Sequence, residues 1–412
     1  MTSGANPDRR NALSAMAGTA SAGLACAGRP TGDSSPEPTP PRFPAEDGRH
    51  IAGEIVHIDS INRRGGLRLD GDQARYFTGP PHWFALLPHA PVWHLGARAE
   101  LRDLPLGCHV HGHFIKPPKG EESTIPPLPG EKMSFTIAEN HAAILEDDFS
   151  YYQRRGQAWK VVSINAEKEK IDLEPVLTKP PAGAVNLPGA GGAGQLVKHG
   201  MNKPQTFDID SRSEVWSGNL LADVSAIKPG MTVQFNLAWA QGWGQGEFRV
   251  GKIWIDAESR EAAGERQRQR HIQFERERWT AGWIDHVDHN DYGGGIVTIT
   301  LFEVDKQILD DLWADRGERI AVAVAEKTRR TWFHRSDRKF AKLVEWKNLE
   351  NPPLGSSPVR LRLHFTELLA GYSTGGYVRV KAERWKFVTV PPEERLTSRA
   401  DQERGARMVL PW

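Results

Sequence analysis

One sequence motif occurs three times along the chain, at intervals of about 100 residues, and it constrains the fold more than any other feature. Each copy consists of two short runs of alternating apolar and polar residues around a turn, which is the pattern of a β-hairpin. The copies occupy residues 53–71, 159–173 and 282–301. Because segments of this length can bury cores of their own, the repeat predicts tandem domains rather than a solenoid.

A second phrase lies downstream of each hairpin and combines a short helical turn, a Gly-containing corner and an alternating strand. Its copies are residues 99–110, 220–233 and 308–320, and further strands are predicted at 248–254 and 377–381. A hairpin, a helical turn and closing strands follow the order of a five-stranded OB-type barrel. The sequence therefore predicts a mainly β protein of three small OB-like barrels in tandem, with short helices.

The copies set the expected domain boundaries. We expect barrel 1 at residues 50–150, barrel 2 at 151–257 and barrel 3 at 279–390. Residues 258–278 are rich in Glu, Arg and Gln, which predicts a solvated helical connector between barrels 2 and 3. Residues 391–412 repeat no strand period and are predicted to be a C-terminal tail.

The first 27 residues have the pattern of a transport signal. The pair Arg9-Arg10 precedes a weakly apolar run rich in Ala, Gly and Ser, and this order resembles a twin-arginine export signal. Cleavage after Ala27, lipidation of Cys26 and retention of an uncleaved cytosolic segment are the alternatives. The Pro-rich residues 28–49 predict an extended tether. We expect export to the periplasm or cell surface, with a lipid anchor as the one candidate contact with the membrane.

Two of the repeated motifs resemble a known group of proteins. The opening Gly53–Asp59 and the Leu-x-x-Gly-x-x-Val corner at Leu104–Val110 are similar to motifs of exported bacterial proteins of unknown function that are built from tandem OB-like small β-barrels. The resemblance extends loosely over residues 50–390. The resemblance implies the fold and a location outside the cytoplasm, and it implies no activity or cofactor.

The charge of the chain is balanced overall but segregated in barrel 3. The whole sequence has 53 basic and 52 acidic residues, which excludes a generally basic nucleic-acid binder. Residues 281–326 contain 3 basic and 10 acidic side chains, whereas residues 327–386 contain 14 and 5. Basic grooves with interleaved aromatic rings bind flexible polyanions on OB-type surfaces.

This segregation predicts a binding surface for an anionic polymer on barrel 3. In an exported protein we expect that polymer to be an acidic polysaccharide or lipopolysaccharide rather than a nucleic acid. The alternative is that the acidic and basic halves neutralise each other within the domain. The candidate ligand-binding residues are Lys327, Arg329, Arg330, Trp332, Arg335, Arg338, Lys339, Arg360 and Arg362.

The sharpest candidate for chemistry is the segment His109-Val110-His111-Gly112-His113. Side chains alternate along a strand, so the three imidazoles project from one face in a row about 7 Å apart. Imidazoles ligate zinc or copper, and three protein ligands would leave a coordination position open. The other interpretation is a histidine row that decorates a solvated strand, because the spacing is wide for all three to reach one ion.

Neighbouring side chains do not complete this candidate metal site by spacing alone. Cys108 points to the opposite face of a regular strand and is therefore a poor fourth ligand. His82, His89 and His94 lie upstream as further candidates. The sequence identifies no carboxylate that would orient the histidines or shuttle protons.

Three short motifs are explained better by the fold than by chemistry. Residues 371–375 match G-x-S-x-G, but a strand follows where a nucleophile elbow needs a helix. Residues 246–252 have phosphate-loop spacing, yet they alternate like a strand. Residues 288–293 begin like a calcium loop, but Ile299 occupies the position of the bidentate Glu.

Two classes of function stay open on the sequence. The first is a non-enzymatic, exported protein of the cell envelope that binds an anionic polysaccharide or another envelope component, or acts structurally. The second is a metal carrier or metallohydrolase with His109, His111 and His113 as ligands. Metal analysis of the purified protein separates the two classes.

Overall fold

A computed structural model of the chain describes three small β-barrel domains. The described residues are 48–60, 63–70, 81–116, 139–179, 201–240, 247–315, 319–324, 338–350, 352, 355–367 and 369–388. All of them belong to one compact unit that runs from Pro38 to Trp412. The predicted export signal with Cys26 and the predicted tail at 391–412 lie outside the described residues. No described helix is long and apolar enough to cross a membrane.

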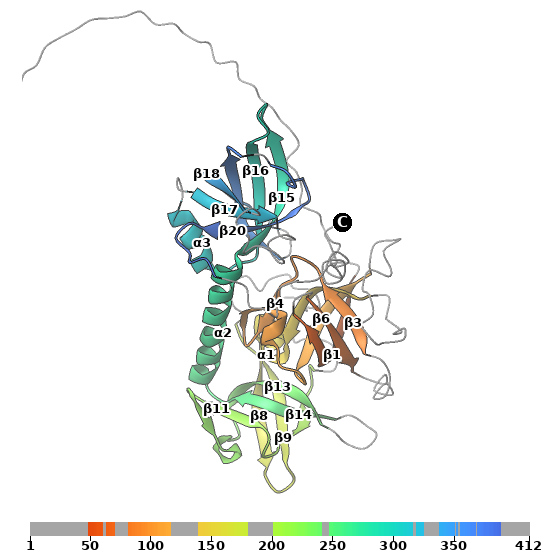
Figure 1. Cartoon of the computed structure of the whole chain (residues 1–412). Helices are drawn as coiled ribbons and strands as arrows, with labels where there is room; N and C mark the ends of the chain where they lie inside the picture. Colours follow the sequence, from red (N-terminus) through yellow and green to blue (C-terminus); the bar gives the residue numbers. More distant parts are fainter. Residues whose placement is uncertain are drawn as a thin grey trace, which may run out of the picture. The chain divides into compact units, whose positions relative to one another are not determined.

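Barrel 1 forms where the first hairpin was predicted (Figure 1). Its elements are β1 (Arg49–Asp59), β2 (Arg64–Leu69), β3 (His82–Leu86), β4 (Val92–His94), β5 (Ala97–Ala99), the 3₁₀ turn η3 (Leu101–Asp103), β6 (His109–Ile115) and β7 (His141–Asp147). Five strands close in the order β3-β2-β1-β6-β7, because β3 also pairs with β7 in parallel. The small β4–β5 hairpin extends the sheet through a parallel pairing of β4 with β7.

Barrel 2 repeats this topology strand for strand. Its elements are β8 (Gln157–Asn165), β9 (Lys170–Leu177), β10 (Gln205–Asp208), β11 (Glu214–Ser217), β12 (Leu220–Ala222), the 3₁₀ turn η4 (Val224–Ala226), β13 (Thr232–Ala240) and β14 (Glu247–Trp254). Again five strands close, in the order β10-β9-β8-β13-β14, and the β11–β12 hairpin is added beside β14. The predicted small five-stranded, OB-like barrels are thereby confirmed for both repeats.

Shared local features explain why the two repeats fold alike. Their corner glycines, Gly107 and Gly230, both have positive φ, at 83° and 91°, a conformation that glycine adopts without steric cost. The first strand of each barrel has a register shift at the same place, after Ile55 in β1 and after Val161 in β8. β-Bulges increase strand twist, which helps a short sheet to close.

Barrel 3 closes with six strands in a different order. Its elements are β15 (Thr280–His289), β16 (Gly295–Phe302), α3 (Lys306–Ala314), β17 (Arg319–Val324), β18 (Arg338–Asn348), β19 (Ser356–Phe365) and β20 (Tyr377–Ala382). The closed order is β15-β16-β19-β18-β17-β20, and every ladder is antiparallel.

Barrel 3 has an additional hairpin, β18–β19, in the segment where the sequence shows clustered basic residues. Its inward positions are apolar, and Leu361, Leu363 and Phe365 are completely buried in the barrel core. Alternation with basic side chains therefore marks a half-buried strand pair here. The motif at 371–375 is loop immediately before β20, and the segment with phosphate-loop spacing lies largely in β14, as expected.

The predicted connector is the helix α2 (Ala257–Arg278), which begins at the N-cap Asp256. It is less solvated than its composition predicted. Ala263, Gln267 and His271 are buried. Gln267 Nε2 donates to the carbonyl of Arg98 at 3.2 Å. The helix therefore packs against β5 of barrel 1 rather than only bridging two domains.

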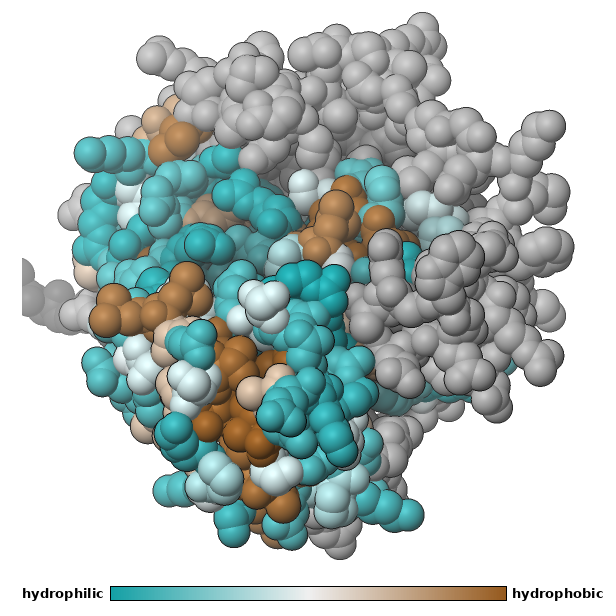
Figure 2. Space-filling view, turned by 90° about the horizontal axis from the view of Figure 1, so that it is seen from below, coloured by the Kyte–Doolittle hydropathy of each residue, from teal (hydrophilic) through white to brown (hydrophobic). Residues whose placement is uncertain are grey.

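Apolar surface gathers in patches between hydrophilic side chains on the face seen in Figure 2. On barrel 2, the large apolar residues that are 49–74% exposed are Val162, Leu177, Leu220 and Leu221. Leu220 and Leu221 lie on β12, so the β11–β12 hairpin of barrel 2 has exposed apolar side chains.

Candidate metal centre

The histidine row of β6 lies where barrel 1 meets barrel 2. Cys108 and Val110 point into the barrel 1 core, so His109 and His111 project from its outer face, as strand alternation predicted. Both histidines are nevertheless buried, at 3% and 5% exposure. The ring of Phe248 from β14 lies 4.6 Å from the His109 ring between centroids. Barrel 2 therefore covers a strand face that a single barrel would leave in water.

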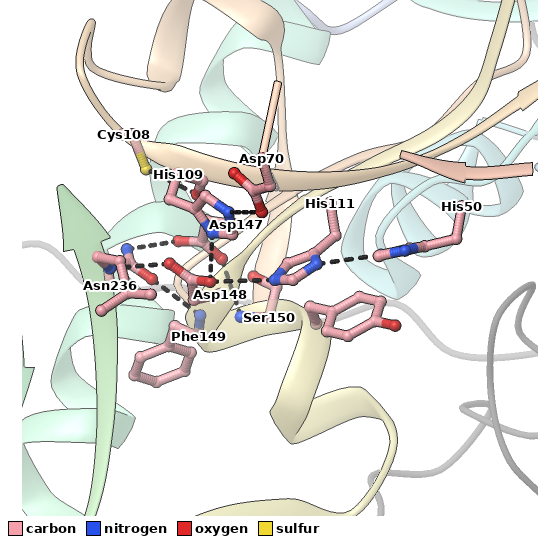
Figure 3. A network of polar contacts seen from close by, with 12 residues as sticks. His50, Asp70, Cys108, His109, His111, Asp147, Asp148, Phe149, Ser150 and Asn236 are labelled. Atoms are coloured by element: carbon pink, nitrogen blue, oxygen red, sulfur yellow. Dashed lines mark hydrogen bonds and ion pairs between the residues drawn. The ribbon is translucent and has the colours of Figure 1, made fainter. Parts of the chain in front are cut away.

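A carboxylate from another element completes the cluster. Asp148 is the first residue of α1 (Asp148–Arg154), the short helix that joins the two barrels. Its Oδ1 lies 2.7 Å from His109 Nδ1 and 3.0 Å from His111 Nε2 (Figure 3). Among the described residues, this is the one group of three His, Cys, Asp or Glu side chains whose ligand atoms all lie within 4.8 Å of one another.

Each member of the cluster has a second partner that fixes its orientation. His109 Nε2 lies 2.9 Å from Asp70 Oδ2, and His111 Nδ1 lies 3.1 Å from His50 Nε2. The other carboxylate oxygen of Asp148 accepts the backbone N–H of Leu237 at 2.8 Å. Metal-ligating histidines almost always use their second ring nitrogen in this way, which sets the tautomer that leaves the first nitrogen for the metal.

Burial and charge act in opposite directions on these groups. Burial alone lowers the pKa of His109, but Asp148 and Asp70 outweigh it and raise the pKa well above its ordinary value. For His111, burial prevails and lowers the pKa despite the hydrogen bond to Asp148. Burial would raise the pKa of Asp148, but the two histidines hold it well below its usual range. Asp148 is therefore an ionised carboxylate in the interior.

The neighbouring Asp147 fixes the position of Asp148 through its own hydrogen bonds. Asp147 Oδ2 lies 2.7 Å from His94 Nδ1 and accepts from Asn236 Nδ2 of β13 at 2.8 Å. Asn236 Oδ1 in turn accepts the N–H of Phe149 at 2.8 Å. Because this chain of hydrogen bonds runs from barrel 1 through the start of α1 to barrel 2, it fixes the helix and the two barrels together (Figure 3).

The two histidines of the cluster line a cavity of about 560 Å³, whereas Asp148 lies behind them and does not line it. The walls include His109 and His111 from β6, Tyr151 and Tyr152 from α1, and Phe248 from β14. Tyr151 stacks on His111 with 3.8 Å between ring centroids. A cavity of this size that is mainly apolar with a few convergent polar groups is typical of a small-molecule site.

The other predicted histidines do not join the cluster. His113 is on the same face of β6 and is buried, but its ring lies against Gly48. His94 binds Asp147, His82 packs edge-on against Phe114, and His89 packs against Trp283 of barrel 3. The structure thus uses two of the three histidines of the row.

The predicted polymer-binding residues are only partly described. Lys327, Arg329, Arg330, Trp332 and Arg335 lie outside the described residues, and Arg338 is described only as a backbone position in β18.

The described cations of that predicted surface have acidic partners. Arg360 Nε lies 3.0 Å from the buried Asp285, Arg362 Nη1 lies 2.7 Å from Glu345, and Lys339 Nζ lies 3.5 Å from Glu367. These contacts agree with the alternative in which barrel 3 neutralises part of its own charge. An anionic-polymer surface stays a prediction.

The chain was compared with protein families, with curated proteins and with solved structures, and none of the three comparisons finds a match. No relative therefore assigns a role to any of these residues. The small closed β-barrels are shown by the structure, whereas the resemblance to exported tandem-barrel proteins stays a prediction. A functional proposal depends on the geometry of the cluster and its cavity.

Proposed function

We propose that this protein binds one divalent transition-metal ion through His109 Nδ1, His111 Nε2 and Asp148 Oδ1. The observation that supports the proposal is the convergence of two imidazoles and one carboxylate oxygen from two elements on a single point. Imidazole and carboxylate donors suit zinc, and imidazole also suits copper. Three protein ligands leave a position open, which is the arrangement of catalytic rather than structural zinc sites.

The distances fit an ion after a rearrangement of the three side chains. Tetrahedral geometry with metal–ligand bonds of about 2.05 Å separates donor atoms by about 3.3 Å. In the structure, Asp148 Oδ1 lies 2.7 Å and 3.0 Å from the two imidazole nitrogens. Side-chain rotations would have to open these two gaps by a few tenths of an ångström. They would also have to bring the two imidazole nitrogens, which lie up to 4.8 Å apart, closer together.

The position of the cluster at a cavity supports a role in chemistry on a small molecule. A metal at this point would act as a Lewis acid or would lower the pKa of a bound water. The protein's own part is to hold the ligands in orientation and to restrict water, because both histidines are at most 5% exposed. We therefore favour a metallohydrolase-type protein over a metal carrier, and over the envelope-binding function.

Metal binding is tested by titrating zinc into chelator-treated protein, with calorimetry and elemental analysis. We expect one zinc per chain, and we expect Asp148→Asn and His111→Ala to lose it. His113→Ala is the matched control, because His113 lies on the same strand face outside the three-ligand group. The absence of stoichiometric zinc in the wild type, or equal loss in the control, would overturn the proposal.

Export is a separate proposal that rests on the N-terminal sequence alone. Arg9-Arg10 and the Ala/Gly/Ser-rich run that follows support a transport signal, with cleavage after Ala27 or lipidation of Cys26 as its outcomes. Mass spectrometry of the mature N-terminus from the native host tests it. A full-length chain with its first residues intact would contradict export by this route.

A further inference from the structure

We propose that two copies of this protein associate through the free edge of β12, and that the two β12 strands pair antiparallel about a twofold axis that passes between their Leu221 residues. The occupant of this edge is therefore a second copy of the chain. The inference is independent of the proposed metal site, because β12 is the last strand of the barrel 2 sheet and contributes nothing to the cluster.

The added hairpin has the same register in barrels 1 and 2. In barrel 1, the pairing of β4 with β5 places Trp93 opposite Arg98. In barrel 2, the pairing of β11 with β12 places Trp216 opposite Leu221. Leu221 is therefore the equivalent of Arg98, and each of these residues is the middle one of a strand at the end of its sheet.

In barrel 1 this edge is covered by a helix. Gln267 Nε2 of α2 donates to the carbonyl of Arg98 at 3.2 Å, so that carbonyl points away from the hairpin. Ala97, the neighbour of Arg98 on β5, is only 8% exposed. The helix thus occupies the edge of β5 and prevents it from pairing with another chain.

The edge of β12 has no such cover among the described residues. Leu220 and Leu221 are 74% and 63% exposed. Successive side chains of a strand point to opposite faces, so both faces of β12 are open. The shared register directs the N–H and C=O of Leu221 away from β11, and no backbone group outside the hairpin bonds to them within the described part of the chain.

The strand also lacks the features that keep an edge unpaired. Natural edge strands are protected by charged side chains, by Pro, by bulges or by a covering element. The sequence of β12 is Leu-Leu-Ala, and its register with β11 is regular. An uncharged apolar edge pairs well with another apolar edge, and a second copy supplies an identical one.

A twofold axis satisfies the free backbone groups of both copies at once. In an antiparallel pair centred on Leu221, each Leu221 donates its N–H to the C=O of the other, and Leu220 lies opposite Ala222. Each copy has then used its free edge, so assembly stops at a dimer. Three residues per strand make a small interface, which predicts a weak dimer.

Sedimentation velocity of the full chain between about 5 and 500 μM tests the dimer, since small interfaces associate in this range. We expect a monomer–dimer equilibrium that Leu221→Arg weakens at least about tenfold, because two like charges would lie directly opposite each other. Leu106→Arg is the matched control, since Leu106 is 65% exposed in a turn of barrel 1. Near-ultraviolet circular dichroism checks that both variants fold. A wild type that stays monomeric, or equal weakening by the two variants, would overturn the inference.

A cross-link tests the register of the pairing. The twofold axis places the two Leu221 Cα atoms about 5.5 Å apart, a separation that a disulfide spans. In a Cys26→Ser chain, we expect Leu221→Cys to give a disulfide-linked dimer on oxidation and Leu106→Cys to give none. Cys108 is buried and does not compete.

The Leu221→Cys chain also distinguishes the other occupants of the edge. If it stays monomeric and its new thiol reacts rapidly with a maleimide, the edge of β12 is open in solution. If it stays monomeric and the thiol reacts slowly, another segment of the same chain covers the edge. Either result contradicts pairing with a second copy.

Discussion

Replacement of Asp148 by Asn is the most informative perturbation of the junction between the barrels. Asp148 is fully buried and ionised, and its two oxygens accept from His109, His111 and the N–H of Leu237. An amide has one acceptor end and one donor end. Whichever way it turns, its NH₂ group faces either the protonated His109 or the N–H of Leu237. The substitution therefore breaks a buried ion pair and also creates a donor–donor contact.

The expected cost follows from these contacts. Removal of one partner of a buried ion pair destabilises a protein by about 3–5 kcal/mol, because the other charge stays buried. We expect a loss of this size in chelator, measured as the free energy of unfolding in urea with near-ultraviolet circular dichroism as the probe. Zinc at a hundred times its Kd should stabilise the wild type by about 2.7 kcal/mol and the variant not at all.

A matched substitution shows whether the position matters. Glu167→Gln neutralises an acid in the exposed β8–β9 turn of barrel 2, and such surface changes are usually worth less than about 0.5 kcal/mol. If Asp148→Asn without metal unfolds within about 1 kcal/mol of the wild type, the carboxylate is not the buried ionised partner described above, since a broken buried pair costs several times more.

Three further predictions concern other parts of the fold. Burial raises the pKa of Glu275 to about 8 and lowers that of His271 to about 4. Between pH 4.5 and 6.5, the ordinary pKa values of the two groups, their contributions to stability oppose each other. Above pH 6.5 only the unfolded chain has lost the Glu275 proton, so stability should fall up to about pH 8. Glu275→Gln should therefore flatten the profile of melting temperature against pH above pH 6.5. Arg360→Met breaks a buried pair and should cost about 3 kcal/mol in urea unfolding, whereas Arg362→Met removes a half-exposed pair and should cost less than about 1 kcal/mol; equal effects would argue against a structural role for Arg360. Gly230→Ala meets no atom within 4 Å, so its cost, measured in the same way, should be the backbone strain of positive φ alone, about 1–2 kcal/mol.

The architecture was more accessible from the sequence than the site. Alternation around a turn reports a hairpin directly, and the three predicted hairpins are β1–β2, β8–β9 and β15–β16. The added β4–β5 and β11–β12 hairpins were not predicted, because strands of three or four residues are too short to show a period. Barrel 3 has its own strand order because the β18–β19 hairpin enters its wall, and the charge of that segment was interpreted as surface.

The carboxylates of the site could not be found from spacing. Asp148 lies 37 residues from His111 in the chain, and Asp70 lies on the far side of the first hairpin. They meet because β7 pairs with β6 and brings the start of α1 beside the histidine row. A run of three acids, Glu146 to Asp148, at the end of a buried strand was the available signal. Acids that are buried in this way need partners, and partners usually come from other elements.

Comparison of the two repeats explains why the histidine row is buried. The corner before β6 runs from Leu104 through Gly107 to Val110, and the corner before β13 runs from Ile227 through Gly230 to Val233. With these corners aligned, each position of the row has an equivalent in barrel 2: His109 corresponds to Thr232, which is exposed, His111 corresponds to Gln234, and His113 corresponds to Asn236.

Two of these equivalents, Gln234 and Asn236, are buried and polar as well. Gln234 donates to the carbonyl of Gln157, and Asn236 holds Asp147. The outer faces of β6 and β13 are therefore the faces that the two barrels turn toward α1, and each of them carries buried polar residues. What distinguishes barrel 1 is that two of its polar residues are imidazoles that converge on one carboxylate oxygen. The repeated topology places buried polar residues at the junction in both barrels, and the histidines of barrel 1 are the ones that the proposed metal site uses.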